Sequence, residues 1–256
     1  MASREDLERY REVAVRAALV AGRVILDREP GQIELKGRAD YVTEVDRAAE
    51  EASREVLARE TGIAVVGEEL GGPEGGEYWL VDPLDGTVNF VHRFPIVGVS
   101  VALISGGRPV AGAVHGPYLD TTFTAARGRG AEQDGSPLSV SSIPPDRAVV
   151  GTGFPFRSKE RLPEYLEVFL PALERFEDLR RPGAVALDLA WVAAGVFDGF
   201  FELGLSPWDV AAGALLIEEA GGVVTDWSGG DDYLTGDVLA GNPAVHAELR
   251  GLAGRA

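Results

Sequence analysis

The chain carries Asp82-Pro83-Leu84-Asp85-Gly86-Thr87 directly after the apolar run Tyr78-Trp79-Leu80-Val81. The apolar run is typical of a buried strand, and Pro83 and Gly86 predict a turn where that strand ends. Two carboxylates three residues apart on such a turn repel each other unless a hard cation lies between them. Mg²⁺ is usually held by one or two carboxylates and by phosphate oxygens, while backbone N–H groups suit an anion. The stretch therefore predicts a site for metal ions and phosphate, although the same pattern is also ordinary turn chemistry.

Two other segments place acids at the ends of expected elements. Ile63-Ala64-Val65-Val66-Gly67-Glu68-Glu69 predicts a short strand that ends in a glycine and paired acids, although exposed glutamates are usually just solvated. Ser206-Pro207-Trp208-Asp209 opens an Ala-rich stretch, residues 210–220, that predicts a helix stopping at Gly221-Gly222. Ser206 and Asp209 also form a capping-box pattern, which alone would explain Asp209. Metal binding and local structure thus both account for these acids.

The order of these segments resembles the inositol monophosphatase family. The matching segments are Lys36 with Asp40-Tyr41-Val42-Thr43-Glu44-Val45-Asp46, Gly67-Glu68-Glu69, Trp79-Leu80-Val81-Asp82-Pro83-Leu84-Asp85-Gly86-Thr87-Val88-Asn89-Phe90, Trp208-Asp209-Val210-Ala211-Ala212-Gly213 and Glu219-Ala220-Gly221-Gly222. They run from residue 36 to residue 222 and cover most of the chain. The resemblance implies an α/β (α+β) fold, a layered α/β/α/β/α sandwich with a metal site between its halves. Residues 1–145 would carry most metal ligands, and residues 146–256 would carry Asp209 and the substrate pocket.

The resemblance also implies a Mg²⁺-dependent phosphate monoester hydrolase with two metal ions and a third, weaker one. Cations do most of the catalysis in such reactions because negative charge spreads over the phosphoryl oxygens in the transition state. The implied ligands are Glu68, Asp82 and the Leu84 carbonyl for the first ion, and Asp82, Asp85 and Asp209 for the second. Glu68 and Thr87 would orient and deprotonate the attacking water, with Asp46 behind Thr87. Thr43 and Asp46 also form a capping pattern, and Lys36 is either a lid cation or a solvated lysine.

The substrate is less well determined. Glu202 interrupts an apolar strand and matches the family position that accepts hydrogen bonds from sugar or cyclitol hydroxyls, whereas Val185 stands where the animal inositol enzymes carry a smaller residue. Asp188 follows on the same pocket wall. The implied substrate-binding residues are Asp85, Gly86, Thr87, Gly183, Val185, Glu202 and Asp209. Inositol 1-phosphate is the favoured substrate.

Cations in the flanking loops keep a second substrate class open. Arginines bind phosphate well, and the loops beside the pocket wall contain Arg157, Lys159, Arg161, Arg180 and Arg181. Fructose 1,6-bisphosphate or a nucleotide bisphosphate is therefore the alternative substrate. A non-catalytic binding protein is disfavoured because every catalytic acid is present.

Composition agrees with an enzyme of this kind. The 256 residues, 45% of them hydrophobic, can bury a substantial core. The net charge of −17 argues against nucleic acid or an anionic membrane as a partner. The chain has no Cys, so the chemistry must come from oxygen ligands or His, and His92, His115 and His246 lack metal-ligand spacing, which favours a structural or exposed place for each. No signal-peptide core or membrane-length apolar run is visible, which predicts a cytoplasmic protein, and the resemblance implies a lithium-sensitive homodimer.

Periodicity predicts the remaining elements. An apolar stripe predicts a helix over residues 4–27, and a second helix is expected over residues 43–60. The polar residues 31–40 between them predict an active-site lid. An antiparallel sheet is expected from residues 97–104, 110–115, 121–125 and 138–140. Short strands should then alternate with helices at residues 163–176, 187–196 and 210–220.

Overall fold

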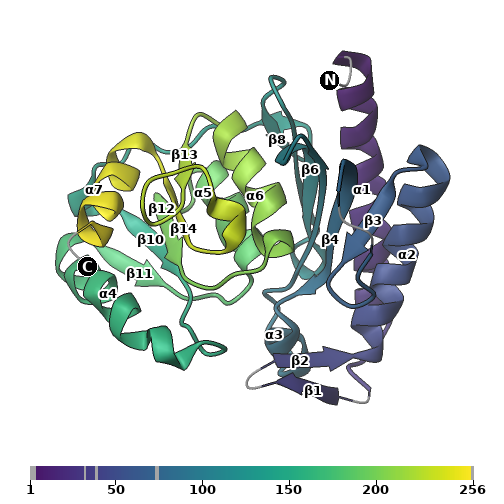
Figure 1. Ribbon diagram of the computed structural model, residues 1–256, viewed down its shortest axis with the longest axis horizontal. Helices are drawn as coiled ribbons and strands as arrows, with labels where there is room; N and C mark the ends of the chain where they lie inside the picture. Colours follow the sequence, from purple (N-terminus) through teal and green to yellow (C-terminus); the bar gives the residue numbers. More distant parts are fainter. Residues whose placement is uncertain (1–3, 32, 38–39, 73–74, 255–256) are drawn as a thin grey trace.

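The computed structural model describes residues 4–31, 33–37, 40–72 and 75–254, and its elements stack in alternating layers of helix and sheet (Figure 1). The outer helices α1 (Arg4–Leu26) and α2 (Glu44–Thr61) cover one face of a large sheet. Helices α5 (Val185–Ala193) and α6 (Pro207–Glu219) lie between this sheet and a smaller one, whose far side is covered by α4 (Leu162–Arg175) and α7 (Pro243–Ala253). The expected α/β/α/β/α sandwich is confirmed. In the described part of the chain, no helix has the length and apolarity that a membrane crossing requires.

The large sheet has seven strands in the order β3-β4-β5-β6-β7-β8-β9. Only β3 and β4 pair in parallel, and every other neighbouring pair is antiparallel. The strands are β3 (Ala64–Gly67), β4 (Glu77–Asp85), β5 (Gly98–Ser105), β6 (Arg108–Gly116), β7 (Thr121–Ala126), β8 (Ala131–Gln133) and β9 (Ser136–Pro137). The strand predicted over residues 138–140 is wrong. Leu138 and Val140 alternate because both pack against the core between the sheets, and each donates one backbone hydrogen bond, Leu138 to Ala131 of β8 at 2.8 Å and Val140 to Ala220 at 3.0 Å, without forming a strand.

The small sheet has five strands in the order β11-β10-β12-β14-β13. They are β10 (Val149–Thr152), β11 (Asp178–Arg180), β12 (Gly199–Glu202), β13 (Val223–Thr225) and β14 (Val238–Gly241). Short 3-10 turns join several elements: η1 (Pro117–Leu119), η2 (Pro145–Arg147), η3 (Lys159–Arg161) and η4 (Tyr233–Thr235). Helices α5 and α6 share one core with strands of both sheets. The division of the chain near residue 145 therefore stays a prediction.

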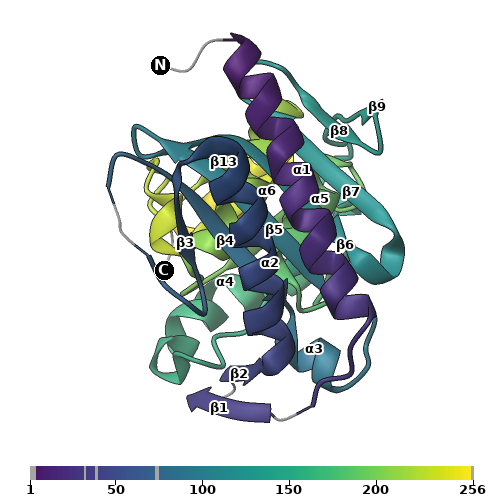
Figure 2. The same cartoon turned by 90° about the vertical axis from the view of Figure 1, so that its right-hand side faces the viewer.

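The described part of the predicted lid belongs to a β-hairpin, and its role as a lid stays a prediction. The hairpin consists of β1 (Ile33–Gly37) and β2 (Asp40–Thr43), and it lies at the end of α2 beside the short helix α3 (Thr87–Val91) (Figure 2). Lys36 belongs to β1, but its side chain lies outside what the structure describes, so its predicted role as a lid cation stays a prediction.

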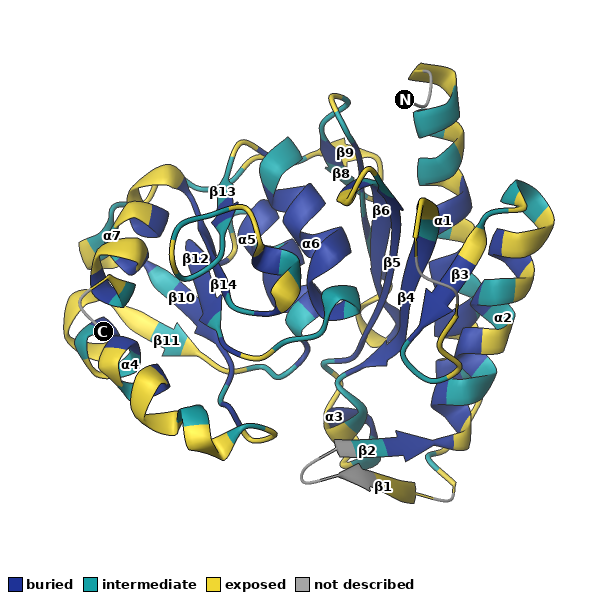
Figure 3. Cartoon of the chain, viewed as in Figure 1, coloured by how far each residue is buried: buried dark blue, intermediate teal, exposed yellow. Residues whose placement is uncertain are grey.

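Burial explains why the two outer helices form where the sequence predicts them. The α1 residues Ala14, Ala17 and Ala21 are fully buried against α2 and the large sheet, which confirms the predicted stripe. Small side chains let the two helices and the sheet approach closely. Figure 3 shows many buried residues in the sheets and in α6, one of the two helices of the middle layer.

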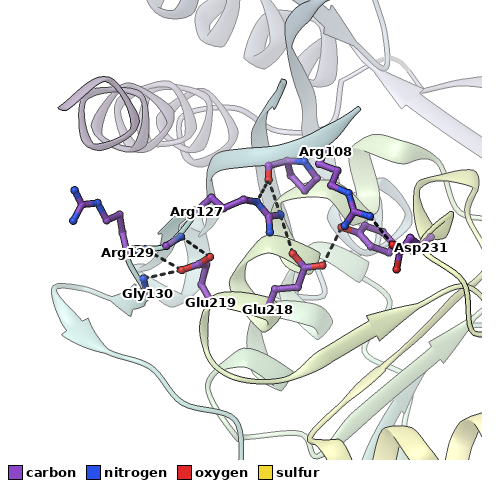
Figure 4. Close-up of polar contacts among 10 residues, drawn as sticks. Arg108, Arg127, Arg129, Gly130, Glu218, Glu219 and Asp231 are labelled. Carbon is purple, nitrogen blue, oxygen red and sulfur yellow. Dashed lines mark hydrogen bonds and ion pairs between the residues drawn. The ribbon is translucent and has the colours of Figure 1, made fainter. Parts of the chain in front are cut away.

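The C-terminal end of α6 is fastened to the turn between β7 and β8 (Figure 4). The Glu219 carboxylate accepts hydrogen bonds from the backbone N–H groups of Gly128, Arg129 and Gly130 at 2.8, 3.0 and 2.8 Å. The neighbouring Glu218 accepts one from Arg127 at 2.8 Å. The other end of α6 carries Asp209, so these contacts fix the far end of a helix that reaches the predicted site.

Candidate active site

Strand β4 continues through the acidic stretch instead of ending at Val81. The pairing of β4 with β5 shifts register between Asp82 and Asp85, so Pro83 lies in a bulge, where the missing N–H of proline is tolerated. The turn predicted at Pro83 is therefore wrong. The chain turns only at Gly86, whose φ of 89° favours glycine and whose Cβ, if present, would lie 3.0 Å from the Ile96 carbonyl oxygen.

Two of the acids sit at the first turns of the middle-layer helices. Asp85 Oδ2 accepts a hydrogen bond from the Ala186 N–H at 2.7 Å, so a strand of the large sheet caps α5. Asp209 Oδ2 accepts one from the Ser206 N–H at 2.8 Å, and the capping box predicted for α6 is present. Ser100 of β5 donates to the Trp208 carbonyl oxygen at 2.9 Å, which ties the start of α6 to the large sheet.

One pocket of about 840 Å³, measured out to its open mouth, gathers the acids that the sequence singles out. Its lining includes Glu68, Asp82, Asp85 and Asp209. Among the described residues, no three His, Cys, Asp or Glu side chains are grouped so as to hold a metal ion as they stand. The acids thus share a pocket without forming a closed cage.

The protonation behaviour of these acids fits a hard cation. Burial raises the pKa of Asp82 well above its usual range, and the charges of Glu68, Asp85 and Asp209 add to the effect. Burial and then the charge of Asp209 raise the pKa of Asp85 to about 7. Buried carboxylates that disfavour each other's charge are stabilised by a cation with oxygen ligands. The donor set therefore fits Mg²⁺.

Thr87, at the start of α3, faces two acceptors. Its Oγ1 lies 3.0 Å from Asp46 Oδ1 and 3.1 Å from the Leu84 carbonyl oxygen, and its single hydrogen can serve only one of them at a time. The other oxygen of Asp46 accepts hydrogen bonds from the N–H of Thr43 at 2.9 Å and from its hydroxyl at 2.5 Å. Asp46 therefore caps α2 with one oxygen and contacts Thr87 with the other, so capping and a role beside Thr87 are compatible.

Glu202 ends β12 and faces the same pocket as the acids. Its carboxylate occupies the space beside Gly153, where any Cβ would overlap with it. Burial and then the charge of Asp209 raise the pKa of Glu202 to about 8, although Arg181 counteracts them. Gly183 and Val185 also line the pocket, whereas Asp188 is buried and is not part of the lining.

The loop cations separate into two groups. Arg157 and Arg181 line the pocket, and the Arg181 guanidinium lies 5.5 Å from the centre of the Phe156 ring. Arg161 pairs with Asp237 at 2.6 Å, and Arg180 pairs with Asp178 at 2.5 Å on the edge strand β11. Lys159 is exposed at the start of η3 and lies outside the lining. Of these five loop cations, Arg157 and Arg181 line the pocket.

Sequence reasoning assigned no role to several residues that line the pocket or support it. Tyr41 of β2 and the loop residues Phe154, Pro155, Phe156 and Ser158 also line the pocket, and no local pattern indicates this. Asn89 belongs to a segment that matches the family, but only the structure shows what it does. Its Nδ2 donates to the carbonyl oxygens of Ile96 at 2.8 Å and Pro182 at 2.9 Å, which joins α3 to the wall carrying Gly183.

Without Mg²⁺, we expect the thermal midpoint to fall as the pH rises from about 5 to about 9. The raised pKa values of Asp85 and Glu202, about 7 and about 8, mean that the folded protein keeps protons that the unfolded chain has already released. The stability from this protonation is present at low pH and is lost as the pH rises through these values. Mg²⁺ should offset the negative charge of the deprotonated carboxylates, so it should raise the thermal midpoint more at about pH 8 than at about pH 6. Scanning calorimetry checks this, and equal Mg²⁺ shifts at both pH values would contradict it.

The chain is similar to known proteins along nearly its whole length. The model of the inositol monophosphatase family matches residues 6–254. The Nus factor SuhB of Escherichia coli strain K12 is 44% identical over 243 residues, which are 91% of each chain. An Aquifex aeolicus strain VF5 protein named fructose-1,6-bisphosphatase/inositol-1-monophosphatase is 42% identical over 250 residues, 94% of each chain.

A solved structure shows the same arrangement. The crystal structure of the extragenic suppressor protein suhB from Bartonella henselae superimposes with a TM-score of 0.90 at 38% identity. The match covers 94% of this chain and 97% of that one. The names of these relatives differ in what they describe, so similarity by itself does not select a substrate.

Proposed function

The chain belongs to the inositol monophosphatase family, and we propose that it hydrolyses sugar or cyclitol phosphate monoesters with Mg²⁺, chiefly inositol 1-phosphate. The observation that carries this proposal is the single pocket that brings Glu68, Asp82, Asp85 and Asp209 together beside Thr87. Phosphate monoesters are hydrolysed very slowly in water, and a catalyst must offset the charge on the phosphoryl oxygens. Four acids in one pocket could bind cations there, and these cations would offset the charge on the phosphoryl oxygens.

Each acid has a defined role in this proposal. Glu68, Asp82 and the Leu84 carbonyl would hold one Mg²⁺, and Asp82, Asp85 and Asp209 would hold a second, with a third, weaker ion near Glu68. When bound, Mg²⁺ neutralises phosphate charge and lowers the pKa of a water molecule. Asp82 has two carboxylate oxygens and would serve both ions. The number of ions belongs to the proposal, as does their division among the ligands.

The chain's own residues would orient and deprotonate the attacking water. When Thr87 donates its hydroxyl hydrogen to Asp46 rather than to the Leu84 carbonyl, its hydroxyl oxygen can accept a hydrogen bond from water. Glu68 provides a second acceptor for the same water. The N–H groups of Gly86 and Thr87 would hold the phosphate.

Other residues of the pocket lining would set the substrate preference. Glu202 can accept hydrogen bonds from sugar or cyclitol hydroxyls, and its negative charge would repel a phosphate placed there. Gly183 and Val185 would form the adjacent wall, with Asp85 and Asp209 accepting hydroxyl hydrogen bonds. Arg157 and Arg181 favour fructose 1,6-bisphosphate as a second candidate, because two cations at the pocket could bind a second phosphate.

Phosphate release from a small substrate panel tests the function directly. The panel is inositol 1-phosphate, fructose 1,6-bisphosphate and a nucleotide bisphosphate, each assayed with Mg²⁺ and with EDTA. We expect turnover with Mg²⁺ and none with EDTA, because the acids cannot surround a phosphate without cations. Full turnover in EDTA, or no turnover of any substrate, would overturn the proposal.

Substitutions at the pocket distinguish the two substrate classes. Glu202→Gln should lower kcat/KM for inositol 1-phosphate selectively. Replacing Arg157 and Arg181 by Ala should weaken fructose 1,6-bisphosphate more than inositol 1-phosphate, since each lost charged hydrogen bond costs about 1.5–3 kcal/mol. Arg180→Ala is the matched control, because its guanidinium pairs with Asp178 outside the pocket. A wild-type preference for fructose 1,6-bisphosphate that the double variant reverses would establish the second candidate.

We also propose a cytoplasmic homodimer that Li⁺ inhibits, on the basis of the family resemblance. The net charge of −17 opposes direct binding of nucleic acid or an anionic membrane. The name Nus factor SuhB, which relatives from Escherichia coli, Salmonella typhimurium and Pseudomonas aeruginosa carry, describes those proteins.

A further inference from the structure

A fully buried carboxylate lies inside the loop that carries Glu68. Glu50 of α2 has no exposed surface, and its Oε2 accepts a hydrogen bond from the Glu69 N–H at 2.7 Å. Its Oε1 accepts one from the Leu70 N–H at 3.2 Å. The loop therefore wraps its backbone donors around a side chain from another element.

The rest of the loop is shaped to admit this carboxylate. Gly67 and Gly71 close the loop through two mutual backbone hydrogen bonds of 3.1 and 3.0 Å. A Cβ at Gly67 would overlap with the Glu50 carboxylate, so only glycine leaves room for it. Glu68 itself donates its N–H to the Val81 carbonyl oxygen at 3.2 Å, directly before Asp82. Displacing Glu50 would thus release the loop next to the β4 acids.

Arg54 completes the arrangement from one turn further along α2. Its Nε and Nη2 lie 3.0 and 2.8 Å from Glu50 Oε1, which compensates the buried charge. Its Nη1 donates to the Val65 carbonyl oxygen at 2.9 Å, and its Nη2 also contacts the Gly71 carbonyl oxygen. The guanidinium therefore connects Glu50 to both ends of the loop.

Asp46 and Glu50 lie four residues apart and project from the same face of α2. Asp46 contacts the Thr87 hydroxyl, and Glu50 holds the loop of Glu68. Glu68 and Thr87 are the two residues proposed to orient the attacking water. The single helix α2 therefore supplies both the side chain that contacts Thr87 and the side chain that holds the loop of Glu68.

We propose that Glu50, with Arg54, is a positioning residue that fixes Glu68 relative to Thr87 and so sets the affinity for Mg²⁺ and the turnover rate. This inference rests on the proposed function. Residues that orient metal ligands typically contribute about 10–100-fold to metal affinity or activity. A purely structural ion pair would contribute to folding stability alone.

The test compares Glu50→Gln with a matched control. The Gln side chain keeps the shape of Glu, but it loses the charge and one acceptor that the loop N–H groups and Arg54 require. The control is Asp198→Asn, because Asp198 is also buried and accepts from the Ser141 hydroxyl at 2.5 Å and the Val149 N–H at 2.7 Å, outside the pocket. Both variants should lose stability, whereas only Glu50→Gln should change the site.

Three measurements follow on each folded variant. Calorimetric titration with Mg²⁺ alone should show about tenfold or greater weakening in Glu50→Gln. Amide hydrogen exchange should show protection lost at Glu69 and Leu70 while α4 keeps its protection. The variant's kcat should fall more than its KM rises, and adding Glu50→Gln to Glu68→Gln should lower kcat no further, because the two residues act as one unit.

Each outcome decides the proposal. If Glu50→Gln loses stability but keeps wild-type Mg²⁺ affinity and exchange at residues 69–70, Glu50 is only structural. If Glu50→Gln does not fold, Arg54→Lys replaces it, since Lys keeps the charge beside Glu50 but cannot reach both loop carbonyls, and it should shift Mg²⁺ affinity in the same direction. If the wild-type protein hydrolyses none of the substrates, the proposed function fails, while Mg²⁺ affinity and amide exchange still decide the role of Glu50.

Discussion

Asp209→Asn should lower kcat by about a thousandfold and leave the protein folded. The substitution removes a charged ligand of the second proposed ion, and a metal ion contributes several kcal/mol to stabilising the transition state. The Asn oxygen can still accept the Ser206 N–H hydrogen bond that Asp209 accepts at 2.8 Å, so α6 keeps its cap. Removal of the charge also relieves repulsion with Asp85, so the thermal midpoint without Mg²⁺ should not fall. Steady-state kinetics and calorimetry on the same sample measure both effects.

Ser206→Ala is the control for capping. It removes the hydroxyl of the capping residue, which should cost about 1 kcal/mol of stability, but it keeps the Asp209 carboxylate and should keep kcat. The two variants should therefore show opposite patterns. If Asp209→Asn loses stability as Ser206→Ala does and keeps its kcat, Asp209 is a helix cap and not a metal ligand.

Thr87→Ala should lower kcat by about 10²–10³-fold and change KM little, because general acid–base groups act mainly in the transition state. The hydroxyl that contacts Asp46 at 3.0 Å and the Leu84 carbonyl oxygen at 3.1 Å is lost, while the backbone N–H groups that would bind phosphate remain. Glu68→Gln should show the same kinetic pattern, since Glu68 is the second acceptor for the water.

Thr87→Ser provides the matched control because it retains a hydroxyl at the same place. It should keep most of the wild-type kcat. If the Ser and Ala variants lose kcat equally, the methyl group matters for packing and the hydroxyl has no catalytic role. If both Thr87→Ala and Glu68→Gln keep the wild-type kcat, the assignment of the water-activating pair is wrong.

The sequence by itself determined the elements whose signals are local. The Ala stripe of α1, the Thr43 cap of α2 and the Ser206-to-Asp209 box of α6 all appear where the sequence predicts them. Caps and apolar periodicity depend on residues within one or two turns of each other, so a short window contains the whole interaction. The long motifs that resemble the family then supplied the layered fold, which periodicity could not.

The tertiary structure decided everything that depends on residues distant in the chain. Pro83 looks like a turn residue, yet pairing with β5 carries β4 past it and places it in a bulge. Arg180 and Arg181 are neighbours in sequence, but the edge strand β11 pairs Arg180 with Asp178, and only Arg181 lines the pocket.

The supports of the site are also decided at long range. Asp85 caps a helix that begins about a hundred residues later, and Glu50 fills a loop formed by residues that follow α2. No local pattern marks Glu50, because a glutamate within a helix is ordinarily a solvated surface residue. Its role arises only when packing of α2 against β3 and β4 buries the carboxylate, since a buried charge must then take its hydrogen bonds from whatever backbone lies around it.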